Sequence, residues 1–213
     1  MNIKWFGHSS FLITSNDGFK ILTDPFPNTI GYKTNDIWTN VVTISHHHFD
    51  HNCLEYVKGD YVVLDKVGET LCSKTLFTGH PSYHDNMHGT KRGLNTIFTF
   101  SLDNINFCHL GDLGYIPTKD EIKSYGEINV LFIPVGGNYT IDSKEAAEVC
   151  RLINPNIIIP MHYKTPALNF DLDNMDDFLL SFNHFEKVNC NSLELDSLQN
   201  IKNKENKVFI LEY

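Results

Sequence analysis

Short apolar runs, each bounded by turn-forming residues, fill the first half of the chain and predict β-strands. The runs over 10–14 and 19–23 flank a turn that contains Asp17-Gly18, and this dipeptide between two such runs is typical of a β-hairpin. The stretch from Asp24 to Asn40 shows no clear period, so a long loop is expected there. The same pattern of apolar runs predicts further strands over 2–6, 41–44, 61–64, 74–78, 96–101 and 105–108.

Helical signals appear in the second half, between further apolar runs. Thr118 and Glu121 have the spacing of a capping box, which opens a short helix. Asp142 can cap a second helix, which Asn154-Pro155 ends, and an amphipathic pattern predicts a third over 173–182. The remaining apolar runs predict strands over 129–135, 156–160 and 208–211, and an exposed turn is expected over 200–207.

Length and composition predict one folded domain over residues 1–213. Of the 213 residues, 41% are hydrophobic and 20% are charged, which excludes a disordered chain. The net charge of −9 disfavours nucleic-acid binding by a broad basic face, and no apolar run reaches the roughly 18 residues of a membrane span. Five cysteines without a C-x-x-C pair, and an N-terminal segment too polar for a secretory leader, favour a cytoplasmic protein with reduced thiols.

Histidine is concentrated at the end of one predicted strand. Four of the eleven histidines fall in one window with the pattern His46-x-His48-x-Asp50-His51. In an extended segment His46 and His48 project to the same side and can chelate one cation, whereas His47 points away. Asp50 and His51 follow after a turn and can reach a second cation close by. Imidazole nitrogen and carboxylate oxygen together suit zinc, manganese or iron.

One segment cannot complete two coordination shells, so other strand ends are expected to supply ligands. A Gly- and Pro-containing stretch, expected to be a loop, carries His80, His84 and His88, and periodicity alone does not choose among them. Asp112 lies in a Gly-flanked turn after a predicted strand, and His162 follows directly after another. Taken singly, each of these residues also fits an ordinary structural role at a strand end.

The order of these motifs resembles the metallo-β-lactamase superfamily. The flanking sequences are similar to one branch, the metal-dependent hydrolases related to L-ascorbate-6-phosphate lactonase, and the match runs from about residue 1 to residue 165. The segments that carry the resemblance are Trp5-Phe6-Gly7-His8-Ser9-Ser10-Phe11, Leu22-Thr23-Asp24-Pro25-Phe26, His109-Leu110-Gly111-Asp112-Leu113-Gly114, Ile133-Pro134-Val135-Gly136-Gly137 and Pro160-Met161-His162-Tyr163.

The resemblance implies an α/β (α+β) fold, a four-layer αβ/βα sandwich with metal ions at one sheet edge. It also implies two divalent ions, with zinc as the first choice and manganese or iron as alternatives. His84 is preferred over the other two loop histidines because its surroundings match the branch, and Asp112 is expected to bridge the ions. The resemblance assigns the first ion to His46, His48 and His84, and the second to Asp50, His51 and His162.

Three further residues are expected to support the ligands from behind, namely Asp24, Asp85 and His109. Asp24 would hold a ligand histidine through its other ring nitrogen. His8, like His109, is expected to pack near the site and not to be a ligand. Asp50 and Asp112 are the expected catalytic residues, because they offset the charge of the metal pair and orient a metal-bridging hydroxide. The residue that moves the proton, Asp50 or Asp85, stays open.

The function implied is hydrolysis of a small anionic ester, lactone or phosphoester. The segments 24–40, 85–92 and 136–139 are the expected walls, and Tyr139, Tyr163 and Lys164 are candidate substrate contacts. The alternatives are an RNA or lipid phosphodiesterase on the same metal core, or a metal-stabilised scaffold without turnover. A small-molecule substrate is expected, nucleic acid is not favoured, no membrane partner is expected, and a homo-oligomer stays an open option.

Overall fold

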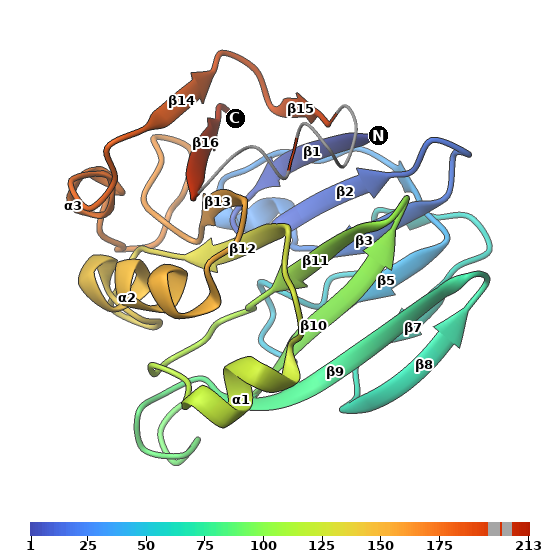
Figure 1. Cartoon of the computed structure of the whole chain (residues 1–213). Coiled ribbons are helices and arrows are strands. Elements are labelled where there is room, and N and C mark those ends of the chain that lie inside the picture. The colour runs from blue at the N-terminus through green and yellow to red at the C-terminus, as the bar shows by residue number, and fades with distance from the viewer. Residues whose placement is uncertain (196–200, 202–205) are drawn as a thin grey trace.

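Two β-sheets stacked face to face form the body of the computed structural model, which describes residues 1–195, 201 and 206–213 (Figure 1). Most of the turn expected over 200–207 lies outside the described residues. A continuous apolar core fills the space between the sheets, with Ile3 and Phe11 from one sheet and Phe107 and Phe132 from the other. Within the described residues, no helix is long and apolar enough to cross a lipid bilayer.

The first sheet has six strands among the described residues. In spatial order they are β15 (Ser192–Glu194), β1 (Asn2–Gly7), β2 (Ser10–Thr14), β3 (Lys20–Thr23), β5 (Val41–Thr43) and β7 (Val62–Leu64). The strands β1, β2 and β3 pair antiparallel, and the expected hairpin joins Thr14 to its partner Lys20. The strands β3, β5 and β7 are parallel. Side chains alternate across the sheet, so Ile13 faces the core between the sheets while Leu12 and Leu22 face outward.

The second sheet has eight strands in the described part of the chain. In spatial order they are β14 (Phe185–Val188), β16 (Lys207–Leu211), β13 (Ile157–Met161), β12 (Val130–Pro134), β11 (Ile105–His109), β10 (Leu94–Leu102), β9 (Thr75–Tyr83) and β8 (Gly68–Cys72). The strands from β11 to β14 in this order are parallel, and β8 to β11 are antiparallel. Every residue of β12 and β13 is buried, as expected for central strands covered on both faces.

Helices cover the outer face of the larger sheet. They are α1 (Lys119–Ser124), α2 (Ser143–Ile153) and α3 (Asp176–Leu179). The predicted capping boxes are present, with Thr118 before α1 and Asp142 before α2. The apolar side chains of α2, among them Ala146 and Val149, join the core cluster of the strands.

The outer face of the smaller sheet has a different cover. A two-stranded ribbon of β4 (Ile37–Trp38) and β6 (Val57–Lys58) packs there with Leu22 and Val42, and the short 3-10 helix η1 (Asn28–Ile30) lies in the preceding segment. The mixed α/β class expected from the sequence is confirmed. The fourth layer, however, is this ribbon, and none of the described α-helices forms it.

Several elements differ from the sequence expectation. The stretch with Gly79 and Pro81 is the second half of β9, not a loop. Proline is tolerated there because the partner strand β8 begins with Gly68 opposite Gly79, so Pro81 lies beyond the pairing of β9 with β8 and its missing amide proton interrupts no ladder on that side. The expected helix over 173–182 shrinks to the four residues of α3, and its N-terminal flank at Met175 provides no side-chain cap. The strands β4, β6, β8, β14 and β15 are not among those expected, and β4 lies at the end of the stretch 24–40 that was expected to be a loop throughout.

The strands that matter for function end at one edge of the sandwich. In each sheet, strands that run in the same direction deliver their carboxyl ends together: β1, β3 and β5 in the smaller sheet and β9, β11 and β13 in the larger one. The backbone amide of Thr96 donates to the carbonyl of Ser45, which ties the two edges together.

Candidate metal centre

Each of these six strand ends contributes a residue to one polar cluster. His8 follows β1, Asp24 follows β3, and the segment 45–51 follows β5. His84 follows β9, Asp112 lies beyond β11, and His162 follows β13. Three of these residues adopt positive φ angles, 51° at His8, 37° at Asp24 and 51° at His162, a conformation that costs non-glycine residues energy and clusters at functional sites.

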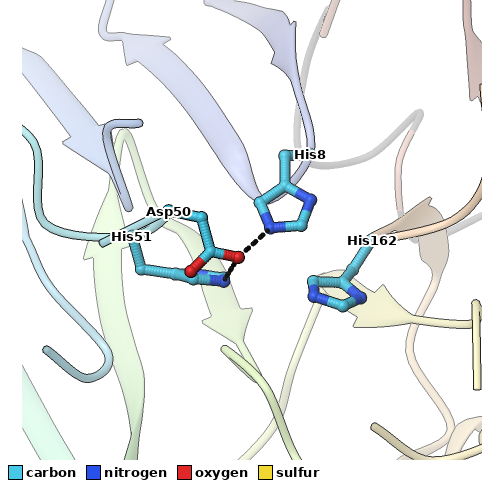
Figure 2. A group of neighbouring side chains, drawn as sticks. All are labelled: His8, Asp50, His51 and His162. Carbon is cyan, nitrogen blue, oxygen red and sulfur yellow. Dashed lines mark hydrogen bonds and ion pairs between the residues drawn. The ribbon is translucent and has the colours of Figure 1, made fainter. Parts of the chain in front are cut away.

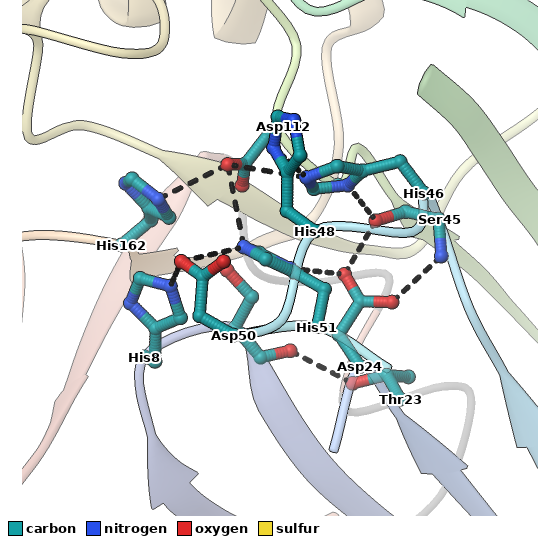
Figure 3. Close-up of polar contacts among 12 residues, drawn as sticks. His8, Thr23, Asp24, Ser45, His46, His48, Asp50, His51, Asp112 and His162 are labelled. Carbon is teal, nitrogen blue, oxygen red and sulfur yellow. Dashed lines mark hydrogen bonds and ion pairs between the residues drawn. The ribbon is translucent and has the colours of Figure 1, made fainter. Parts of the chain in front are cut away.

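Asp112 lies at the centre of the cluster (Figure 3). Its Oδ2 atom is 3.1 Å from the Nε2 atom of His84, 3.2 Å from that of His162, 3.3 Å from that of His51 and 3.8 Å from that of His46. Its backbone amide donates to the Asn95 side chain at 3.0 Å. The preceding Gly111 has φ of 54°, and a Cβ atom there would lie 2.5 Å from Ser45 Cβ, so the chain can approach only because this residue is glycine.

Three overlapping sets of side chains place their donor atoms close enough to share an ion. The sets are His46, His48 and His84; His46, His51 and Asp112; and His8, Asp50, His51 and His162. In the first set Nε2 of His46 lies 3.0 Å from Nδ1 of His48. All seven residues expected as ligands therefore lie together, and His8 joins them.

Asp24 connects two of these sets from behind. Its Oδ2 atom accepts hydrogen bonds from His51 Nδ1 at 2.9 Å and from the Ser45 hydroxyl at 2.6 Å, while Oδ1 accepts from the Ser45 amide at 2.8 Å. The Ser45 hydroxyl in turn accepts from His46 Nδ1 at 2.9 Å when that nitrogen carries the proton. This arrangement aims Nε2 of both His46 and His51 at Asp112 and leaves that of His46 without a proton. Burial lowers the pKa of His51, but Asp112 and Asp24 outweigh burial and raise it well above its usual range, so a bound ion would displace the proton from His51 Nε2.

The charge state of the cluster favours a cation. Burial lowers the pKa of His46 to about 3, so its imidazole is neutral and offers a lone pair to the nearby carboxylate of Asp112. Burial raises the pKa of Asp112, but His162 and His51 outweigh burial and hold the pKa well below its usual range. Two acceptors that face each other in a buried site are unfavourable unless a cation lies between them. His51 Nε2 and Asp112 Oδ1 are also buried and have no hydrogen-bond partner, so the donor set fits a metal ion.

His8 holds the other carboxylate of the site (Figure 2). Its Nε2 atom lies 3.1 Å from Oδ2 of Asp50, and Asp50 Oδ2 lies 3.6 Å from Nε2 of His51. Burial lowers the pKa of His8 to about 4, so a neutral His8 donates one hydrogen bond to Asp50. Burial raises the pKa of Asp50, but the bond from His8 and the nearby His51 outweigh it, so the carboxylate is ionised.

The other candidate residues have different partners. His80 points to Thr99 at 2.9 Å, and His88 is exposed, with its ring centre 5.3 Å from that of Tyr83. His109 uses both ring nitrogens, since Nε2 donates to the Ser9 carbonyl and Nδ1 accepts from the Gly111 amide. It therefore packs beside the site and cannot also bind an ion. The exposed His47 points away toward Asp65, as expected from strand alternation.

Asp85 organises a loop. Its Oδ1 atom accepts from the amides of Met87 at 2.7 Å and Gly89 at 2.9 Å, and its Oδ2 atom accepts from those of Lys91 at 2.9 Å and Arg92 at 2.8 Å. Burial raises the pKa of Asp85, but these four amides outweigh burial and lower it to about 2. Both oxygens are occupied, so the earlier option that Asp85 moves a proton does not fit the structure.

A cavity of about 390 Å³ opens above the cluster. It is lined by His48, Phe49, Asp50, His84, Arg92, Asp112, Tyr139, His162 and Phe170. Two of the three expected walls contribute, through Arg92 and Tyr139. The segment 24–40 does not line the cavity. Its Phe26 and Ile30 belong instead to a separate apolar cluster with Leu168 and Leu172, against which Phe170 packs.

Two expected substrate contacts must be corrected. Tyr163 is buried, and its ring stacks on Trp5 with the ring centres 5.6 Å apart. The ammonium of Lys164 donates to the carbonyls of Leu168 at 2.7 Å and Phe170 at 2.6 Å. Neither side chain lines the cavity. The sequence predicted that the segment 85–92 forms a wall of the substrate site, but it did not single out Arg92. The only sequence signal for this residue is its position between Gly89 and Gly93.

Two stacked mixed sheets with a cluster of histidine and aspartate side chains at one edge are typical of the metallo-β-lactamase fold. The chain belongs to the β-lactamase superfamily, because a family model described as a beta-lactamase superfamily domain matches residues 2–162. A UPF0173 metal-dependent hydrolase of Carboxydothermus hydrogenoformans is 27% identical over 213 residues, covering 83% of this chain and 91% of that protein.

Solved structures agree with this assignment. The crystal structure of a candidate Zn-dependent hydrolase of the metallo-β-lactamase superfamily from Thermotoga maritima has a TM-score of 0.82 and 41% identity, and covers 99% of this chain and 98% of that one. The metallo hydrolase Igni18 from Ignicoccus hospitalis has a TM-score of 0.62 at 22% identity, covering 80% of this chain and 86% of that one, and shows the fold alone.

Proposed function

We propose that this chain is a dinuclear metal-dependent hydrolase that acts on a small anionic ester, lactone or phosphoester. The observation that carries the proposal is the position of Asp112, whose Oδ2 atom lies within 3.1–3.8 Å of four histidine nitrogens from three chain segments at the floor of a cavity. The superfamily membership and the relatives named as metal-dependent hydrolases support the same activity.

Two ions are proposed because the donor atoms divide into two sets on either side of Asp112. His46, His48 and His84 would hold one ion, and Asp50, His51 and His162 would hold the other. Asp112 would touch both, since its carboxylate is near histidines of each set. Zinc fits this donor set, and so do manganese and iron.

Bound divalent ions would supply an activated water at neutral pH and would polarise the oxygen of the substrate. The side chains supply the rest. Asp24 fixes the tautomers of His46 and His51 and thus the direction of their lone pairs. The ionised Asp50, held by His8 and facing the cavity, is placed to accept a proton from the attacking water.

The cavity favours a small substrate. Its volume of about 390 Å³ is in the range of sites for small molecules, and the chain carries a net charge of −9, which opposes a polyanion such as RNA. The apolar rings of Phe49 and Phe170, whose centres are 6.0 Å apart, line the cavity beside its charged residues.

The test combines metal analysis with a hydrolase screen. The metal-free protein is reconstituted with zinc, manganese or iron(II), and hydrolysis of esters, lactones and phosphodiesters is measured. We expect two ions per chain and turnover of at least one class. The Asp112→Asn variant should lose the carboxylate that would bridge the two ions, and with it the turnover. Asp17→Asn, the same change in the exposed β2–β3 turn, should affect neither the ions nor the turnover. Two bound ions without any turnover would favour the scaffold, and less than one ion per chain would refute the proposal.

A further inference from the structure

The guanidinium of Arg92 is the one permanent positive charge on the described lining of the cavity. It faces a site whose other charged lining residues are Asp50 and Asp112. Within the described part of the chain, no carboxylate forms an ion pair with Arg92. A half-buried arginine without an acidic partner in a concave site is poised to bind an anion from solution.

Three contacts hold Arg92 in this position. Its backbone amide donates to Asp85 Oδ2, so the carboxylate that organises the 86–92 loop also fixes the origin of the side chain. Its guanidinium carbon lies 5.4 Å from the ring centre of Tyr139, in a cation–π contact. One terminal nitrogen donates to the Asn138 carbonyl at 3.0 Å, which leaves the other donors of the planar group free to meet a ligand.

We propose that Arg92 recognises a carboxylate or phosphate group of the substrate that is separate from the bond to be cleaved. This inference rests on the proposed function and adds the substrate's second functional group. The bond to be cleaved would lie at Asp112, and the anionic group would lie at Arg92 on the wall of the same cavity. The substrate is then a bifunctional small molecule, and its anionic group contributes to binding more than to the chemical step.

Charge alone does not single out Arg92, because its neighbour Lys91 is also basic. Lys91, however, is exposed and does not line the cavity. The pair therefore offers a matched comparison: Arg92→Gln and Lys91→Gln remove one positive charge each from adjacent positions of one loop. Arg92→Lys keeps the charge but removes the planar, two-pronged donor.

The experiment compares two esters that differ in charge and by one methyl group, with the metal-loaded protein. Mono-para-nitrophenyl glutarate carries a free carboxylate, and its methyl ester is neutral. We expect Arg92→Gln to raise KM for the anionic ester about 10- to 100-fold, to leave kcat within about threefold, and to leave the neutral ester unaffected. Lys91→Gln should change neither ester, and Arg92→Lys should lie between wild type and Arg92→Gln. A third ester that carries a phosphate in place of the carboxylate shows which anion is preferred.

A binding measurement separates this inference from the proposed function. Calorimetry of glutarate and of inorganic phosphate with metal-loaded protein needs no turnover, and we expect about 10-fold weaker binding by Arg92→Gln than by Lys91→Gln. Equal affinity of wild type and Arg92→Gln would overturn the inference, as would an equal loss on both esters. Anion binding that depends on Arg92, without hydrolysis of any ester class, would instead overturn the proposed function. Melting temperatures of all variants verify that they are folded.

Discussion

Replacing Asp24 with asparagine tests whether one buried carboxylate directs histidines of both proposed metal sites. Three donors converge on Asp24: the Ser45 amide on Oδ1, and the Ser45 hydroxyl and His51 Nδ1 on Oδ2. An asparagine has one acceptor oxygen, so its NH2 group must face at least one of these donors. A donor that faces a donor in a buried site costs about 1–3 kcal/mol, so we expect the metal-free protein to lose stability by this amount.

Asp24→Asn should weaken metal binding more than any substitution of an exposed residue does. Loss of the partner behind a ligand histidine weakens metal binding about 10- to 100-fold, or about 1.4–2.8 kcal/mol. Because Asp24 contacts His51 directly and His46 through Ser45, both binding steps should weaken. Ser45→Ala removes only the link to His46, so only one step should weaken.

The assay is a competition titration of the metal-free protein against a chromophoric chelator, together with metal content per chain. Asp17→Asn is the control for the loss of one negative charge, since Asp17 is exposed in the β2–β3 turn. A folded Asp24→Asn variant that binds two ions as tightly as the Asp17→Asn variant would refute the reasoning, because the tautomers of His46 and His51 would then not depend on Asp24.

Three further outcomes are expected. Chelation of ions present at about 1,000 times their Kd should remove about 4 kcal/mol of stability per site and lower Tm by about 8–16 °C in differential scanning fluorimetry, and an unchanged Tm would contradict a resident metal. Phe132→Ala should lower the free energy of unfolding in urea by about 3–5 kcal/mol, because the fully buried ring packs 4.4 Å from the ring centre of Phe11; a loss below about 1 kcal/mol would contradict this packing. Burial raises the pKa of Cys108 and Cys150, so mass spectrometry after alkylation at pH 8 should find the exposed Cys190 labelled first and these two only after unfolding.

The sequence predicted best those features of the fold and the site that depend on residues close together in the chain. The pattern from His46 to His51 follows a buried strand, and strand alternation alone separates His46 and His48 from His47. The capping boxes of α1 and α2 are equally local, and both are present. In these cases the physical cause lies within a few residues, so one sequence contains it.

Other features depend on contacts between distant segments, and the sequence could not supply them. The strand β8 has four exposed residues out of five, so it lacks the apolar alternation that marks a strand and exists because β9 pairs with it. The choice of His84 over His80 depends on where β9 ends, which its pairing with β10 decides. Arg92 enters the cavity because Asp85 folds the loop around its carboxylate, a cause that spacing does not reveal.

The candidate metal centre also joins the two sheets, and this links binding to folding. His8, Asp24 and the segment 45–51 come from the six-stranded sheet, whereas His84, Asp112 and His162 come from the eight-stranded sheet. The donor sets can therefore form only when the sheets are stacked, and ions bound there would hold the two edges together. Because the unstacked chain would not bring these donors together, the free energy of metal binding would become free energy of folding. The positive φ angles at His8, Asp24 and His162 oppose this closure, so bound ions would offset backbone strain at the edge where the strain is concentrated.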